Sequence, residues 1–271
     1  MLGAMSGVDI ALQAVDAYFD LARMLHEGKL DLAWLAPVPF LSLALQSRVV
    51  PLAAIRGAPY QSALIVRADS ALSGAKAVLR RRAGWVDPYS AAGFIVPRVQ
   101  LARLGIDPRV SFSRETFYGS HDAVVDAVVS GACDFGATYA WKGRDEVLHG
   151  PWTATSAPVR VLAAFGSIPP DVIAARSDVD RDVRKSIVRG LKRMMMIDDA
   201  RRVTADVFGS LGFCRPNMAA YEELRALVLG AYRKGLLDIA DRPDPLDVAK
   251  TLEIRVPLPP MSPPPRPRGG R

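Results

Sequence analysis

The segment GKLDLAWLAPVPFLSLALQSRVVPLAAIRGAPYQSALIVR, residues 28–67, decides the fold class. Its apolar runs at 30–35, 49–55 and 62–67 have the length and composition of buried strands. Two prolines shortly after the first run are typical of a helix start, so the pattern predicts a helix over residues 37–45. This alternation of strand and helix favours a parallel sheet with helices packed on its faces.

The alternation continues on both sides of this segment. Upstream, the pattern predicts a strand at 8–12 and a helix at 18–27. Downstream, a second α/β unit is expected, with strand 85–86, a helix from Ala91, strand 110–112, a helix from His121 and strand 134–137. The last predicted elements are strands 159–165 and 172–175 and helices 182–208 and 218–233.

Composition sets limits on size and partners. The chain has 271 residues, of which 50% are apolar, so it can bury one large core or two smaller ones. Beyond residue 252 the chain is rich in proline and arginine, and segment 253–271 is predicted to be disordered. Four of the positive charges are arginines of this tail, so the folded body is only mildly basic. Basic patches with interleaved aromatic residues are absent, which argues against a nucleic-acid partner.

Cysteines and hydropathy exclude several other classes. Cys133 and Cys214 are too few and too far apart for a disulfide framework or a metal site. No apolar run reaches about 18 residues, the length typical of a membrane span. The first residues lack a basic region and a cleavage signature, so the chain as written carries no export signal.

Several residues are candidates for a binding site. Residues 87–94 follow a predicted strand and open a helix, so their N–H groups form a potential anion cradle or an ordinary helix start. His121 also begins a predicted helix, where its ring either donates to an oxyanion or caps the turn. Tyr18 and Tyr60 lie at element junctions and would pack there in the simplest interpretation. Asp171 lies in a proline-rich turn and has an equally simple interpretation as a turn residue.

Taken in order, these segments resemble the phosphonate/phosphate-type substrate-binding family of ABC transporters over most of residues 8–235. The motifs that carry the resemblance are Tyr18, GKLDLAW at 28–34, YQSALIV at 60–66, DPYSAAGFIVP at 87–97, GSHD at 119–122 and GACD at 131–134.

The resemblance implies an α/β fold, a two-lobed clamshell of the type 2 periplasmic-binding-protein class, with a mainly parallel sheet flanked by helices in each lobe. Residues 1–66 with 168–252 would form one lobe and residues 67–167 the other. It further implies a solute-binding component of an ABC-type uptake system that holds a small anion, such as phosphonate, phosphate or phosphite, between the lobes. The ligand-binding residues implied are Tyr18, Tyr60, Ser90, Ala91, Ala92, His121 and Asp171.

The same resemblance sets expectations about partners and location. ABC permease subunits are the implied protein partners of a monomeric chain, with no cofactor and no metal. Family members are periplasmic and begin with an export signal and a first strand–helix unit, both of which this sequence lacks. A late start codon or a truncated gene would explain that difference, and a shortened cytoplasmic protein would explain it equally.

Two departures from the family pattern concern the ligand. The family loop offers hydroxyl groups where this chain has Ala91 and Ala92, so only backbone donors remain at those two positions. Members that bind an aminoalkyl group carry a carboxylate where this chain has Trp141. The sequence therefore disfavours an amine-bearing ligand and favours an apolar or planar group.

The sequence also allows two alternative functions. Ser90, His121 and Asp171 supply the residue types of a nucleophilic triad, but Ser90 lacks the G-x-S-x-G elbow, so the sequence predicts no enzyme. A ligand-sensing regulatory module with the same fold, not coupled to transport, is the second alternative, with the proline-rich tail as a tether.

Overall fold

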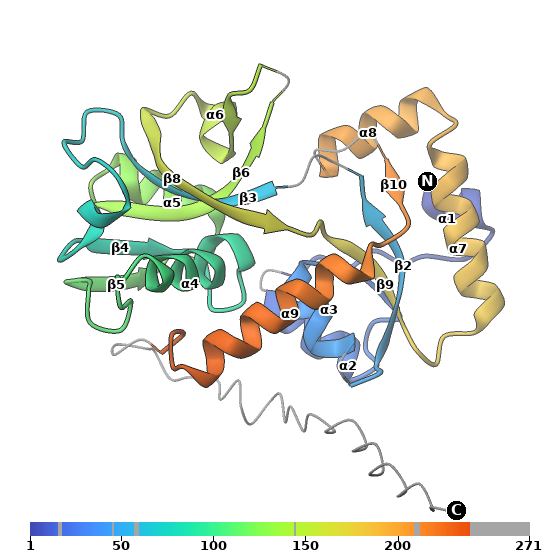
Figure 1. Ribbon diagram of the computed structural model, residues 1–271. Helices are drawn as coiled ribbons and strands as arrows, with labels where there is room; N and C mark the ends of the chain where they lie inside the picture. Colours follow the sequence, from blue (N-terminus) through green and yellow to red (C-terminus); the bar gives the residue numbers. More distant parts are fainter. Residues whose placement is uncertain (16–17, 45, 57–59, 144, 209–211, 239–271) are drawn as a thin grey trace, which may run out of the picture.

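The computed structural model describes residues 1–15, 18–44, 46–56, 60–143, 145–208 and 212–238 (Figure 1). The helices are α1 Leu2–Ser6, α2 Tyr18–His26, α3 Pro37–Ala44, η1 Ala75–Val78, η2 Ala91–Ile95, α4 Val96–Arg103, α5 His121–Val129, α6 Pro151–Thr155, α7 Arg181–Met194, α8 Asp198–Phe208 and α9 Met218–Arg233. The strands are β1 Leu32–Leu35, β2 Val49–Ile55, β3 Tyr60–Arg67, β4 Arg82–Trp85, β5 Arg114–Phe117, β6 Phe135–Lys142, β7 Leu148–His149, β8 Val159–Ile168, β9 Val172–Arg176 and β10 Phe213–Cys214.

The first sheet has the strand order β1-β9-β2-β10, and each of its pairings is antiparallel. Strands β1 and β2 run parallel to each other, as expected, but they are not neighbours. Strand β9 lies between them, because the chain returns from the second sheet in the opposite direction. The expectation of a mainly parallel sheet is therefore wrong for this sheet.

The second sheet has the order β5-β4-β6-β3-β8, with β7 paired to the free end of β6. Strand β4 is parallel to β5 and β6, whereas β3 is antiparallel to both β6 and β8. This sheet is mixed because β3 enters it and β8 leaves it as long antiparallel strands. The predicted α/β unit lies in its parallel part.

The two faces of the second sheet bury different helices. On one face, Trp85 packs edge to face against Phe94, Phe112 and Phe135, with ring centroids 5.8 Å away in each case. On the other face, helix α5 approaches closely, because a Cβ at Gly136 would lie 2.5 Å from the Val124 side chain. Helices η2 and α5 therefore begin at the same end of the sheet but on opposite faces.

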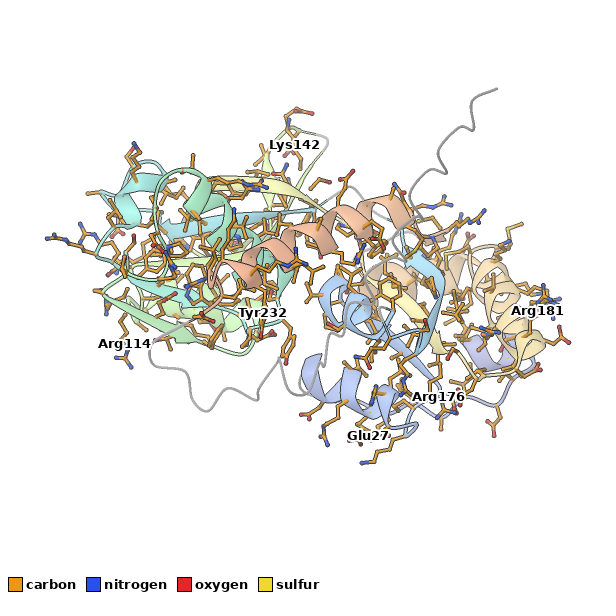
Figure 2. The ribbon with its side chains drawn as sticks, turned by 60° about the horizontal axis from the view of Figure 1, so that its bottom comes forward. Glu27, Arg114, Lys142, Arg176, Arg181 and Tyr232 are labelled. Carbon is orange, nitrogen blue, oxygen red and sulfur yellow. The ribbon has the colours of Figure 1, made fainter. Side chains whose placement is uncertain are left out.

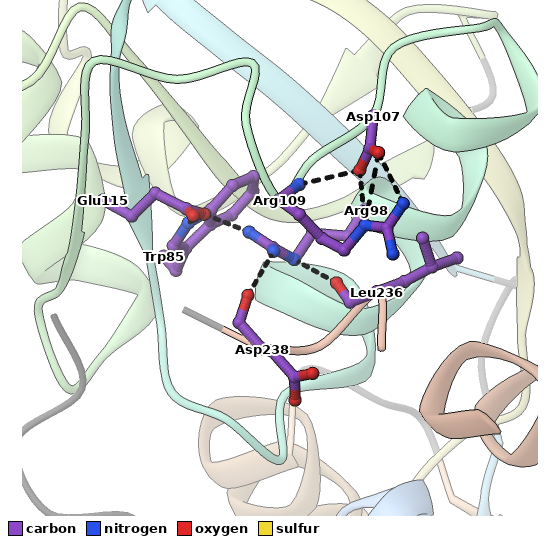
Figure 3. A network of polar contacts seen from close by, with 7 residues as sticks. All are labelled: Trp85, Arg98, Asp107, Arg109, Glu115, Leu236 and Asp238. Carbon is purple, nitrogen blue, oxygen red and sulfur yellow. Dashed lines mark hydrogen bonds and ion pairs between the residues drawn. The ribbon is translucent and has the colours of Figure 1, made fainter. Parts of the chain in front are cut away.

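Helix α9 runs from the first sheet towards α4 beside the second sheet (Figure 1). Beyond its end, Arg98 of α4 donates hydrogen bonds to the carbonyl oxygens of Leu236, at 2.6 Å, and Asp238, at 2.9 Å. The Arg98 guanidinium is fully buried and also pairs with Glu115, whose carboxylate accepts a hydrogen bond from the Trp85 indole (Figure 3). We call Trp85, Arg98, Glu115, Leu236 and Asp238 the Arg98 network.

Some predicted elements differ from the observed ones. The strand expected at 8–12 is wrong, because this stretch is largely exposed and joins no sheet in the described part of the chain. The strand expected at 110–112 lies instead at 114–117, after a turn in which the Asp107 carboxylate accepts the Arg109 N–H. The helix expected over 182–208 is divided in two near residue 196.

The predicted disordered tail, 253–271, lies outside the described residues. Within the described ranges, no helix is both long and apolar enough to cross a bilayer.

Candidate ligand-binding site

The serine loop, residues 87–92, follows β4 and includes the first two residues of η2. The Ser90 hydroxyl is buried and accepts the Gly93 N–H at 2.9 Å, which caps the start of η2. Its hydroxyl hydrogen can still donate. The N–H groups of Ala91 and Ala92 lie in the first turn, where helix geometry provides no carbonyl partner. This loop therefore offers neutral donors to an anion.

Position 93 has to be glycine because the backbone of the loop packs directly against Val86. A Cβ there would lie 2.3 Å from a methyl group of Val86. The loop is fixed to the sheet by Ser62 of β3, whose buried hydroxyl donates to the Ala92 carbonyl oxygen at 2.7 Å. Two chain segments that are distant in the sequence thus position the N–H groups of η2.

His121 is the first residue of α5. The Ser120 hydroxyl caps this helix by accepting the Ala123 N–H at 3.1 Å, so the histidine ring is not needed for capping. His121 Nδ1 lies 2.8 Å from the Thr138 hydroxyl, and its ring packs edge to face on Tyr139 with centroids 4.8 Å apart. Burial lowers the pKa of His121 to about 4, so the ring is neutral at pH 7.

Aromatic residues of β3 and β6 extend this cluster. Tyr60 and Tyr139 meet edge to face at 6.5 Å, and Tyr139 stacks on Trp141 at 5.9 Å. The register explains the contact, since Tyr60 pairs with Trp141 and Ser62 pairs with Tyr139 across the two strands. Trp141 remains 36% exposed, so part of its ring surface is accessible.

Asp171 lies between β8 and β9, where the chain passes from the second sheet to the first. Burial raises the pKa of its carboxyl group to about 7, and a hydrogen bond from the Trp34 side chain opposes that shift. Burial raises the pKa values of Tyr139 and Tyr221. The charges of Asp122 and Asp171 raise the pKa of Tyr139 further, and the charge of Asp171 does the same for Tyr221. Tyr221 also donates to the Pro170 carbonyl oxygen at 2.5 Å.

The structure brings most of the predicted residues together. Tyr60 and His121 both contact the Tyr139 ring, the charge of Asp171 contributes to the raised pKa of Tyr139, and the serine loop is joined to the same sheet by Ser62. Tyr18 opens α2, but its side chain lies outside the described part of the structure. The site residues that sequence reasoning missed are Trp34, Ser62, Thr138, Tyr139 and Tyr221.

The charge of this cluster is unusual for an anion site. Among the side chains just described there is no lysine or arginine, and His121 is neutral. Asp87, in the serine loop, accepts the Tyr89 N–H at 2.6 Å, and burial raises its pKa to about 6. An anion would therefore be held by N–H and O–H groups rather than by a cation. In the described residues, no group of three or more His, Cys, Asp or Glu side chains could hold a metal ion.

The chain passes twice between the two sheets, from β2 to β3 and from β8 to β9, and Asp171 lies at the second passage, so the fold consists of two α/β lobes. Solved structures show the same fold. A phosphonate-transporter binding protein from Pseudomonas aeruginosa superposes with a TM-score of 0.75 at 19% identity, covering 93% of this chain and 85% of that one. PhnD1 from Prochlorococcus marinus, solved with methylphosphonate, gives a TM-score of 0.69 at 16% identity, covering 87% and 89%. The fold is the type 2 periplasmic-binding-protein clamshell.

The family follows from the sequence match. The family model described as ABC transporter, phosphonate, periplasmic substrate-binding protein matches residues 1–221, and the chain belongs to this family. The phosphate-import protein PhnD of Mycolicibacterium smegmatis is 27% identical over 196 residues. That match covers 64% of this chain and 61% of the relative, so the chain spans less than two thirds of the relative's length.

Proposed function

We propose that this chain is the solute-binding component of an ABC-type uptake system and that it binds a small oxyanion between its two lobes. One observation carries the proposal. The first turn of η2 and the His121 ring, both capable of donating hydrogen bonds, belong to helices that begin at the same end of the second sheet. Amide groups at helix starts and a histidine without a nearby cation suit a phosphonate, phosphate or phosphite group.

The proposal assigns a role to each predicted residue. N–H groups of Ala91 and Ala92, with the Ser90 hydroxyl, donate to the oxyanion. His121 donates from Nε2 while Nδ1 stays with Thr138. Tyr18 and Tyr60 would donate their hydroxyl groups from the two lobes, and Asp171 would accept a hydrogen from a protonated ligand oxygen.

The lobes follow from the same proposal. One lobe is built on the first sheet and the other on the second. Strand β3 pairs with β6 and β8 of the second sheet, so the boundary expected at residue 66 is moved to the connection between β2 and β3. Closure of the lobes would then complete the site, as in other clamshell binding proteins. The partners are the permease subunits of the transporter, the location is the periplasm, and the binding form is a monomer.

Catalysis is not part of this function. In a nucleophilic triad the histidine bonds both the serine and a carboxylate. Here the Ser90 oxygen accepts the Gly93 N–H, and Nδ1 of His121 lies beside Thr138. Binding and release of an unchanged ligand is the activity that fits these contacts.

Calorimetric titration with phosphate, phosphite, methylphosphonate and methanesulfonate tests the proposal. We expect saturable one-to-one binding of at least one of them. The names of relatives support this panel, since one imports phosphate and another was solved with methylphosphonate. A folded protein that binds none of the four would refute the assignment.

A further inference from the structure

An open cavity lies beside the first sheet, between β2 and the outer helix α7. A cavity of about 490 Å³ is lined by the following residues: Val50, Pro51, Leu52, Arg181, Arg184, Lys185, Val188 and Arg189. Small-molecule pockets typically measure about 300–1,000 Å³. Figure 2 shows Arg181 at the opposite end of the molecule from Arg114, which belongs to the second sheet.

The lining of this cavity carries four cationic side chains and no carboxylate. Lys185 pairs with Asp182 at 2.8 Å, and Arg189 donates to the Ser186 hydroxyl at 2.7 Å. Within the described ranges, no ion pair of 4 Å or less involves Arg181, Arg184 or Arg189. Three guanidinium groups are thus available to an anion from outside.

The position of these cationic side chains at the start of α7 is unfavourable when no anion is bound. The N-terminal end of a helix carries partial positive charge, so cations there are repelled. Helix α7 nevertheless places Arg181, Arg184 and Lys185 within its first five residues. The Asp180 carboxylate accepts the N–H groups of Asp182 and Val183, and together with Asp182 in the first turn it offsets part of this positive charge. A bound anion would relieve this repulsion.

The remaining lining is apolar. Val50 and Leu52 of β2 and Val188 of α7 are each half-buried. We infer that this cavity binds an organic di- or triphosphate, with the phosphates between Arg181, Arg184 and Arg189 and an apolar or planar body on β2. Arginine suits this role because its guanidinium group binds phosphate oxygens in pairs. This site is independent of the oxyanion site between the lobes.

Titration of the full chain with inorganic triphosphate and with ATP, both without Mg²⁺ and at low salt, tests the inference. We expect saturable one-to-one binding of both, with ATP tighter because its nucleoside adds apolar contact. The Arg184→Gln/Arg189→Gln variant should bind about tenfold more weakly or worse, because each lost charge-assisted hydrogen bond is worth roughly tenfold or more in affinity. Circular dichroism confirms the fold of each variant.

Lys192→Gln/Arg202→Gln is the matched control, since it removes the same charge from exposed positions of α7 and α8 outside the lining. We expect its affinity for triphosphate to change less than about threefold. An equal loss in both variants would overturn the inference in favour of a general basic field. Binding only to phosphatidylglycerol vesicles or to polyglutamate, without triphosphate, would overturn it as well. Methylphosphonate binding should not change in either variant, which separates this test from that of the proposed function.

Discussion

The Arg98 network encloses a fully buried cation, whereas the Tyr139 cluster, which consists of Tyr60, His121, Thr138, Tyr139, Trp141 and Asp171, contains half-buried ionisable groups. Arg98 is 0% exposed and its guanidinium reaches Glu115 and the carbonyl oxygens of Leu236 and Asp238 (Figure 3). In the other region, His121 meets a hydroxyl group and Asp171 meets an indole, and neither has an ion pair within the described residues.

The difference in pairing indicates that the Arg98 network stabilises the fold, whereas the Tyr139 cluster is suited to bind a ligand. A buried charge whose hydrogen bonds are satisfied fixes the position of the chain around it. Buried groups that lack a charged partner shift their pKa towards the neutral form and keep hydrogen-bonding capacity for a ligand. The Arg98 network therefore holds the end of α9 on the second lobe, and the Tyr139 cluster keeps the hydrogen-bonding groups that the proposed ligand site requires.

The largest effect is expected from Arg98→Met. Loss of the guanidinium leaves the Glu115 carboxylate and two carbonyl groups without their donor. Removing one partner of a buried ion pair typically costs about 3–5 kcal/mol. We expect urea unfolding to show a decrease of this size, with little change in oxyanion affinity for the molecules that remain folded.

Arg103→Met is the control, because Arg103 lies on the same helix but is exposed. It should cost less than about 0.5 kcal/mol. Adding Glu115→Gln to Arg98→Met should recover part of the loss, since no carboxylate then remains buried. Equal stability of the two single variants would show that the Arg98 network is not a stabilising centre.

The pH dependence of stability tests the Tyr139 cluster without a ligand. The pKa of Asp171 is raised from 3.8 to about 7 in the folded state, so between these values the folded chain binds more protons than the unfolded chain. The free energy of unfolding therefore falls as pH rises through this window, by no more than about 4 kcal/mol. Asp171→Asn, measured by urea unfolding from pH 5 to pH 8, should remove this fall and keep an acceptor for Trp34.

His121 changes the free energy of unfolding with pH in the opposite direction, because its pKa is lowered from 6.5 to about 4. Its contribution to stability is present above pH 6.5 and is lost as pH falls towards 4. Asp178→Asn removes an exposed carboxylate and controls for the change in net charge. If the free energy of unfolding of Asp171→Asn varied with pH in parallel with that of the wild type, Asp171 would not be held in its neutral form in the folded state.

A smaller effect is expected from Ser62→Ala. This change leaves the Ala92 carbonyl oxygen without the buried donor that holds η2 to the sheet. One such hydrogen bond contributes about 1 kcal/mol to stability. Ser42→Ala is the control, since Ser42 donates within helix α3 to the Val38 carbonyl oxygen, which lies inside the helix ladder. Thermal unfolding should separate the two variants, and identical midpoints would contradict the role given to Ser62.

The sequence predicted those parts of the fold that depend on local pattern. Helices α2, α3, α5 and α9 begin where periodicity and helix-start residues place them. The place of β9 could not be predicted, because it depends on pairing between residues more than a hundred positions apart. The stretch at 8–12 has the alternation of a strand, but alternation without a partner strand forms no ladder.

The same limit explains what was missed in the site. The family resemblance pointed to the serine loop, Tyr60, His121 and Asp171, all of which lie at or beside the end of an element. Tyr139 and Thr138 lie within β6 and carry no local signal. They become site residues only through the register of β6 on β3 and the approach of His121 from α5.

The most direct measurement is the oxyanion affinity of His121→Ala, determined by calorimetry beside the wild type and Arg98→Met. We predict that His121→Ala binds the preferred oxyanion at least about tenfold more weakly, the loss of one charge-assisted hydrogen bond, while its melting temperature changes by only a few degrees. Arg98→Met should show the reverse, with lower stability and unchanged affinity. Unchanged affinity in His121→Ala would contradict the assignment of the Tyr139 cluster as the ligand site.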